Sequence, residues 1–250
     1  MEEPMWNELL PEHLLVIDTT RGRLLVEMCP ELAPRAVERV KLLAREGVYN
    51  GLQFHRVIDG FVAQTGNPNN RGGGASHHPD LLPEFSARLP LGTAWTCIQR
   101  TADFNAGFLG TLPVLTTSDA ETARQTDGKV QVWGAYCPGV AGMGRQHAPD
   151  SANSEIFFMR GSAFRLNLNF TAWGNVVVGR EVVEQMAVGE PPASPDLMLR
   201  VQVASDMAQR PRVEAMDTNC TAFRELVQKT REARGADFSL SDVQVPTRLI

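Results

Sequence analysis

One run of residues limits the possible folds more than any other part of the chain. Residues 54–67 place aromatic and aliphatic side chains around a few polar ones and end at a glycine turn, which is typical of short β-strands. Arg56 and Gln64 stand among these apolar neighbours. Because its guanidinium is permanently charged and presents several donors in one plane, we interpret Arg56 as a functional arginine carried on a strand.

This run resembles the signature of the cyclophilins, a family of proline cis/trans isomerases. In that family the signature reads Phe-His-Arg-aliphatic-Ile-x-Gly-Phe-Met-x-Gln-Gly-Gly-Asp. The chain departs from it at Val62, Thr65 and Asn67. So many other matches at fixed spacing make the resemblance specific. The matching residues are Phe54, His55, Arg56, Ile58, Gly60, Phe61, Gln64 and Gly66.

Segments on both sides of the signature follow the family order. Two aliphatic runs within residues 14–28 predict a hairpin, and apolar residues at helical spacing up to Gly47 predict an amphipathic helix. The resemblance covers roughly residues 14–205 and implies a mainly β fold, a closed antiparallel barrel capped by two helices. Its later segments are 139–144, 151–158, 166–167, 170–179 and a final helix over 181–186.

Two parts of the chain exceed the family pattern. Residues 86–139 form a long insertion, in which the alternating runs 92–98 and 129–134 are expected to pair as an added hairpin. Beyond residue 210, Asp217, Thr218 or Asn219 is expected to cap a helix whose apolar residues share one face and which ends before Gly235. We therefore divide the chain into a cyclophilin-like domain, 1–210, and a C-terminal helical extension, 211–250. The apolar residues of that helix are Phe223, Leu226 and Val227.

We expect the extension to cover the barrel surface, with a partner-binding arm as the alternative. The sequence does not indicate what the insertion meets.

The resemblance assigns catalytic roles to Arg56 and Gln64. Rotation about a peptide C–N bond removes its partial double-bond character, and the proline nitrogen then gains lone-pair density. A donor aimed at that nitrogen stabilises the twisted state more than either planar state, and Arg56 is the expected donor. Gln64 matches the family glutamine that orients the arginine and hydrogen-bonds the substrate backbone. His55 is expected to be structural, because the reaction needs no proton transfer.

The substrate-binding positions of the family fall on residues in both halves of the chain. Val62 replaces a methionine, and Phe170 stands where the family often has a histidine or tyrosine. Glu155 replaces a glutamine; we expect it to pair with Arg56, and activity is then expected to be low. Arg145 replaces an asparagine whose backbone holds the substrate. The full set is Phe61, Val62, Gly144, Arg145, Glu155, Phe157, Leu166 and Phe170.

Composition removes several other classes of function. The chain of 250 residues has a formal net charge of -5 and no basic stripe with interleaved aromatics, so nucleic acid is not an expected partner. No apolar run reaches the roughly 18 residues of a membrane span, and the first residues lack the features of a secretion signal. Segments 144–151 and 166–171 resemble extracytoplasmic bacterial relatives. The periplasm is therefore favoured if an export signal has been removed, and otherwise the cytoplasm.

Two alternatives accompany this interpretation. His77, His78 and Asp80, with His147 and Asp150 farther on, suggest a metal site for hydrolysis. Neighbouring histidines on an extended loop are expected to point apart, however, so we expect neither a metal nor another cofactor. The second alternative is a cyclophilin-fold binding or chaperone protein without useful turnover. In both this case and the enzymatic one, the expected partners are proline-containing peptides and unfolded or folding proteins. The disulfide state of Cys29, Cys97, Cys137 and Cys220 stays open.

Overall fold

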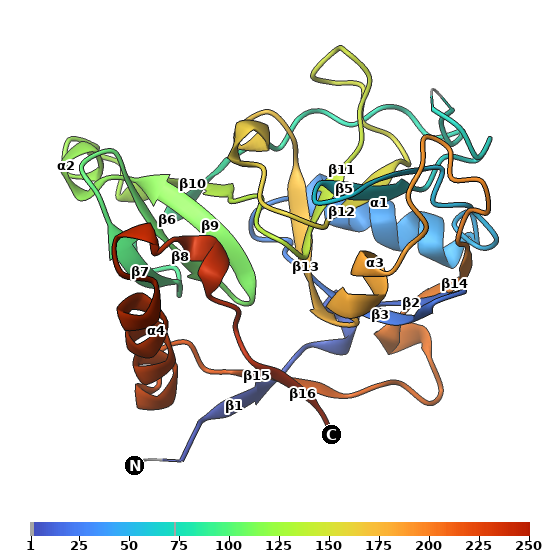
Figure 1. The fold of residues 1–250 in the computed structure, drawn as a ribbon. Helices are drawn as coiled ribbons and strands as arrows, with labels where there is room; N and C mark the ends of the chain where they lie inside the picture. The colour runs from blue at the N-terminus through green and yellow to red at the C-terminus, as the bar shows by residue number, and fades with distance from the viewer. Residues whose placement is uncertain (1–2, 73) are drawn as a thin grey trace.

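A curled eight-stranded sheet forms the larger part of the computed structural model, which describes residues 3–72 and 74–250 (Figure 1). Its strand order is β14-β2-β3-β13-β11-β12-β5-β4. The two edges meet where Gln53, ahead of β4, forms an antiparallel bridge with Leu197, ahead of β14. The predicted mainly β, barrel-like fold is therefore confirmed. The strands are β2 (Leu14–Thr19), β3 (Gly22–Met28), β4 (Arg56–Ile58), β5 (Val62–Thr65), β11 (Val140–Met143), β12 (Ile156–Met159), β13 (Ala172–Val178) and β14 (Met198–Val203).

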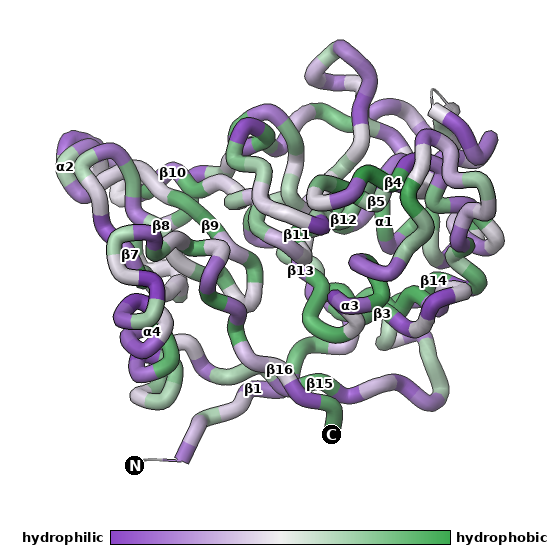
Figure 2. The backbone as a smooth tube through the Cα atoms, viewed as in Figure 1, coloured by the Kyte–Doolittle hydropathy of each residue, from purple (hydrophilic) through white to green (hydrophobic). Residues whose placement is uncertain are grey.

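Two helices close the barrel, as expected. α1 (Pro34–Arg45) begins at a proline, which needs no N–H partner there, and buries one apolar face; α3 (Arg180–Glu184) buries Val182 and Val183. Both contribute to the barrel core, where each fully buried aliphatic side chain contributes about 1.5–3 kcal/mol of transfer free energy. In Figure 2 hydrophobic residues follow β3, whereas hydrophilic and hydrophobic residues alternate along α1. The barrel core includes Leu15, Ile17, Leu24, Val26, Val37, Val40, Leu43, Phe54, Ile156, Phe158, Trp173, Val176 and Val183.

The insertion forms a sheet of its own, in the order β6-β10-β9-β8-β7. The expected hairpin between 92–98 and 129–134 is wrong, because β10 pairs with β6 and β9 whereas β7 pairs with β8 at the far edge. Two strands that the sequence analysis did not recognise, β8 and β9, form the hairpin around Gly110 instead. The strands are β6 (Ala87–Pro90), β7 (Thr96–Arg100), β8 (Phe104–Leu109), β9 (Leu112–Thr117) and β10 (Lys129–Gly134), with the short helix α2 (Asp119–Thr122) before β10.

The C-terminal helix packs on the inserted sheet, so the expectation that it covers the barrel surface is wrong. Helix α4 (Thr221–Arg234) lies beside β7 and β8 (Figure 1), and the ring of Phe223 meets that of Phe108 edge-on with centroids 5.8 Å apart. Arg231 donates to the carbonyl of Ile98 at 2.6 Å. The helix ends at Gly235, as predicted, but its N-cap is Cys220 and not one of the three preceding polar residues.

Both ends of the described chain meet in a small three-stranded sheet, in the order β1-β15-β16. Its strands are β1 (Trp6–Glu8), β15 (Val213–Met216) and β16 (Thr247–Leu249). Within residues 3–72 and 74–250, no helix has the length and apolar character needed to cross a bilayer. The four cysteines are free thiols. Among the described residues, five 3-10 turns complete the elements: Pro11–His13, Phe164–Leu166, Ala204–Asp206, Gly235–Asp237 and Leu240–Asp242.

A second core joins the barrel to both added parts. One side of the barrel, the inserted sheet and the C-terminal part bury their apolar residues in a single continuous cluster. The C-terminal part is thus packed against the rest of the molecule through buried side chains. The second core includes Val62, Phe157, Met159, Leu166, Phe108, Val114, Val132, Tyr136, Phe223, Leu240 and Val245.

Candidate active site

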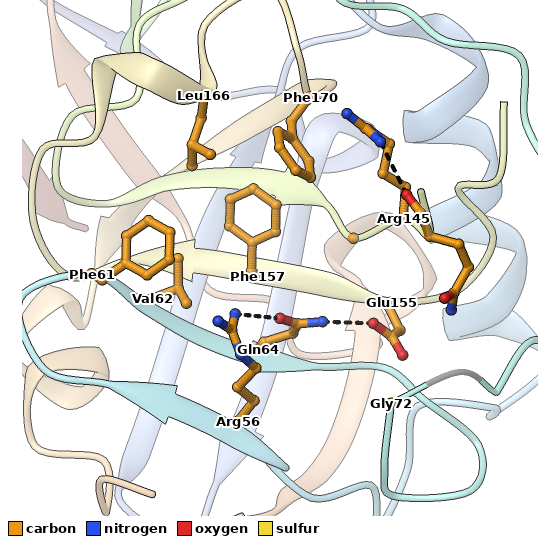
Figure 3. A pocket seen from close by; sticks show the side chains of 12 residues that line it. Arg56, Phe61, Val62, Gln64, Gly72, Arg145, Glu155, Phe157, Leu166 and Phe170 are labelled. Carbon is orange, nitrogen blue, oxygen red and sulfur yellow. Dashed lines mark hydrogen bonds between the residues drawn. The ribbon is translucent and has the colours of Figure 1, made fainter. Parts of the chain in front are cut away.

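The residues predicted as catalytic or substrate-binding all line one open cavity of about 310 Å³ on the outside of the barrel (Figure 3). Strands β4, β5 and β12 form its floor, and the chain around residues 144–146 and 164–170 forms its rim. Gly72 and Gln146, which the sequence analysis did not name, also line it. The structure therefore brings together side chains that are far apart in the sequence.

Sheet pairing explains how the polar and apolar parts of the cavity come to lie side by side. Arg56 on β4 faces Gln64 on β5, and Gln64 faces Phe157 on β12. Side chains of directly paired residues point to the same face of a sheet, so the guanidinium, the amide and the ring form one row. Gly142 on β11 is the next residue in that row, and a Cβ atom there would collide with the Phe157 ring. The glycine leaves the space that the ring occupies.

The apolar end of the row is a pocket walled by aromatic and aliphatic side chains. Phe157 is buried and meets Phe170 edge-on, with ring centroids 5.9 Å apart. Tyr136 stacks on Phe157 at 5.8 Å, from the chain that follows the inserted sheet. Val62 is buried, and Leu166 closes the pocket from the rim (Figure 3). This arrangement is suited to holding a small apolar ring.

The polar end of the row is a chain of hydrogen bonds. Arg56 donates from Nη1 to Oε1 of Gln64 at 3.2 Å, and Gln64 donates from Nε2 to Oε2 of Glu155 at 2.6 Å. The other carboxylate oxygen of Glu155 accepts from Nδ2 of Asn67 at 2.6 Å. The expected direct pairing of Glu155 with Arg56 is therefore wrong, because the amide of Gln64 stands between the two charges (Figure 3).

The ion-pair partner of Arg56 is Glu190, a residue that the sequence analysis missed. Arg56 donates from Nε to Oε2 of Glu190 at 2.7 Å, and the side chains are 37% and 54% exposed. The two residues are 134 positions apart in the chain, so no local pattern could have linked them. Asn67, in contrast, could have been found from the sequence, because it is one of the departures from the family signature.

The side chain of Arg145 turns toward Phe170 and away from Arg56 (Figure 3). Its guanidinium carbon lies 4.5 Å from the Phe170 ring centroid, and its Nε donates to the carbonyl of Asn169 at 3.0 Å. The side chain is thus held by the rim.

His55 lies under the polar end without joining it. The side chain is buried, with Nε2 4.0 Å from Oε1 of Glu155. Burial lowers the pKa of His55, and the charge of Glu155 opposes that shift only in part. The imidazole is consequently neutral near pH 7, which suits a structural residue.

Comparison with known proteins identifies the family. Residues 14–204 match the family model described as "Cyclophilin type peptidyl-prolyl cis-trans isomerase/CLD". The chain belongs to this cyclophilin family. Its members act on proline-containing peptides and proteins. A "Probable peptidyl-prolyl cis-trans isomerase" of Brucella suis biovar 1 is 28% identical over 212 residues, which cover 78% of this chain and 85% of the relative.

Solved cyclophilin structures resemble the chain to different extents. The crystal structure of cyclophilin AquaCyp293 from Hirschia baltica matches with a TM-score of 0.90 at 29% identity, over 98% of this chain and 93% of that one. That likeness therefore includes the inserted sheet and the C-terminal part. A Cryptosporidium parvum cyclophilin matches with a TM-score of 0.53 at 18% identity, over 76% of this chain and 98% of that one, which indicates the shared fold alone.

Proposed function

We propose that this cyclophilin-type peptidyl-prolyl isomerase works through Arg56, with the aromatic pocket holding the proline ring of a peptide or of an unfolded or folding protein. Uncatalysed X-Pro rotation crosses a barrier of about 18–20 kcal/mol, which makes exchange slow. The observation that carries the proposal is the single row in which Arg56, Gln64 and Phe157 share one face of the sheet.

In this proposal the two ends of the row divide the work. The proline ring packs on Phe157 between Val62 and Leu166, where it is anchored while the preceding carbonyl swings. The guanidinium of Arg56 then donates to the proline nitrogen as that atom loses conjugation. The planar ground states present no such lone pair, so the interaction stabilises mainly the transition state.

Gln64 orients Arg56 in this mechanism. Its Oε1 accepts from Arg56, which fixes the direction of the guanidinium, and its Nε2 is held by the buried carboxylate of Glu155. The hydrogen bond to Glu155 orients the Gln64 amide, so that oxygen rather than nitrogen faces the cation. The backbone at Gly144 and Arg145 is then the expected contact for the substrate chain.

A second candidate is a cyclophilin that binds proline segments with little turnover. The ion pair between Arg56 and Glu190 favours it, because a neighbouring carboxylate competes for the guanidinium. The shorter side chain of Val62, in place of methionine, also favours the binding candidate, because it contacts less of the proline ring.

A protease-coupled assay on a proline peptide separates the two candidates. We expect Arg56→Ala to lower kcat/KM by about 100-fold or more, as removal of a donor to a transition state commonly does. Arg56→Lys should also lose most activity, because an ammonium lacks the planar array of donors. Arg23→Ala, which removes an exposed arginine paired with Asp18 on the β2–β3 hairpin, is the matched control. If the parent and Arg56→Ala have equal rates and both bind the peptide, only the second candidate, a cyclophilin that binds without useful turnover, remains.

A further inference from the structure

Two histidines and a glutamate gather beside the C-terminal end of α1, outside the residues that line the proline cavity. One imidazole nitrogen from each of His77 and His78 and one carboxylate oxygen of Glu46 lie within 4.8 Å of one another. His78 Nε2 is 2.9 Å and 3.1 Å from the two oxygens of Glu46. The expectation that the neighbouring histidines point apart is wrong, since their ring centroids are 4.0 Å apart.

The spacing suits a small divalent cation with nitrogen and oxygen ligands. Zinc binds imidazole nitrogen and carboxylate oxygen at about 2.0–2.2 Å in tetrahedral sites, which places two ligand atoms roughly 3.3 Å apart. The distances between His78 and Glu46 lie just below that value. His77 is exposed and its ligand nitrogen lies within 4.8 Å of the other two ligand atoms, so rotation of its side chain can complete a three-ligand site.

The backbone around His78 is already fixed by buried partners. The carbonyl of His78 accepts from Nδ2 of Asn153 at 2.9 Å, and the carbonyl of Pro79 accepts from Nη2 of Arg39 at 2.7 Å. Asn153 and Arg39 are 6% and 7% exposed. A site held in this way loses little conformational entropy when an ion binds, which favours affinity.

The position of Glu46 adds an electrostatic contribution. Glu46 is the C-cap residue of α1, a helix of 12 residues. The last carbonyl groups of a helix carry partial negative charge and favour a nearby cation, by about 0.3–1 kcal/mol at exposed positions. The helix end, the carboxylate and the two imidazoles all favour a cation at this place.

We propose that Glu46, His77 and His78 bind one zinc ion, with the fourth coordination position open to water. The ion would link the loop carrying both histidines to the end of α1. This site is independent of the mechanism proposed for Arg56, because none of its three residues lines the proline cavity.

Isothermal titration calorimetry of the untagged full chain with zinc chloride, after chelator treatment and dialysis, tests the proposal. We expect one equivalent of zinc to bind with a micromolar dissociation constant, and calcium and magnesium, which prefer all-oxygen sites, to give no signal. His78→Ala and Glu46→Gln should each weaken zinc binding at least tenfold, and His77→Ala should weaken it as well.

Two controls address other ligands in the chain. His147→Ala removes an exposed histidine that is not part of the cluster, and Cys97→Ser removes a partly exposed thiol; both should bind zinc like the parent. Circular dichroism of each variant checks that the fold is retained. Absence of zinc binding by the parent, or unchanged binding by folded His78→Ala and Glu46→Gln, would overturn the proposal.

Discussion

At the scale of single residues, the direction of one guanidinium is set by two acceptors of different charge. Neutral Gln64 holds Nη1 of Arg56 from within the row, and charged Glu190 holds Nε from outside it. Glu155 acts on Arg56 only through the amide of Gln64. Arg56 is therefore oriented by a neutral amide within the row and partly neutralised by a carboxylate outside it.

Replacement of that carboxylate should raise the rate. In Glu190→Gln the neutral amide no longer offsets the charge of Arg56, so its field at the proline nitrogen becomes stronger. Exposed ion pairs are worth about 0–1 kcal/mol, which sets an expected gain in kcat/KM of roughly two- to fivefold, with stability almost unchanged. The protease-coupled assay measures this, with Glu181→Gln, an exposed glutamate at the start of α3, as the control of equal charge change. A clear loss of activity would instead show that Glu190 holds Arg56 in its working position.

At the scale of elements, local patterns predicted the segments better than their partners. The hairpin of β2 and β3 and helix α1 follow from alternation and helical spacing within one stretch, and the structure has them where they were expected. In the insertion, β10 was recognised as a strand, but its neighbours β6 and β9 were not foreseen. Pairing over such distances depends on side chains that meet only in the folded state. The ion pair of Arg56 with Glu190 was missed for the same reason.

The docking of α4 on the inserted sheet leads to a stability prediction. Phe223 is fully buried against Phe108, so Phe223→Ala leaves a cavity in the second core and should cost about 3–5 kcal/mol of unfolding free energy. Urea denaturation followed by circular dichroism measures the loss. Phe164→Ala removes an aromatic ring that is 46% exposed and should cost well under half as much. A loss in Phe223→Ala as small as that expected for Phe164→Ala would mean that the packing of α4 contributes little to the stability of the molecule.

At the scale of the whole molecule, the barrel core and the second core share their strands. Along β12, Ile156 and Phe158 point into the barrel core, whereas Phe157 and Met159 point into the second core. On β13, Trp173 points into the barrel core and Ala172 points into the second core. Successive residues of a strand face opposite sides, so each strand is buried on both faces. The apolar wall of the candidate cavity is consequently part of the contact between the barrel and the added parts.

Shared strands predict that the barrel, the inserted sheet and the C-terminal part unfold together, because loss of either core exposes apolar residues of β12 and β13. Two variants test this, one keeping only Trp173 in the barrel core and the other only Trp133 on the inserted sheet, with phenylalanine at the other tryptophan positions. In each variant, the fluorescence transition in urea should have the same midpoint as the circular dichroism transition of that same variant. If Trp133 reports a transition at lower urea than circular dichroism while the Trp173 transition coincides with it, the added parts unfold on their own, and the barrel would then be a separate unit.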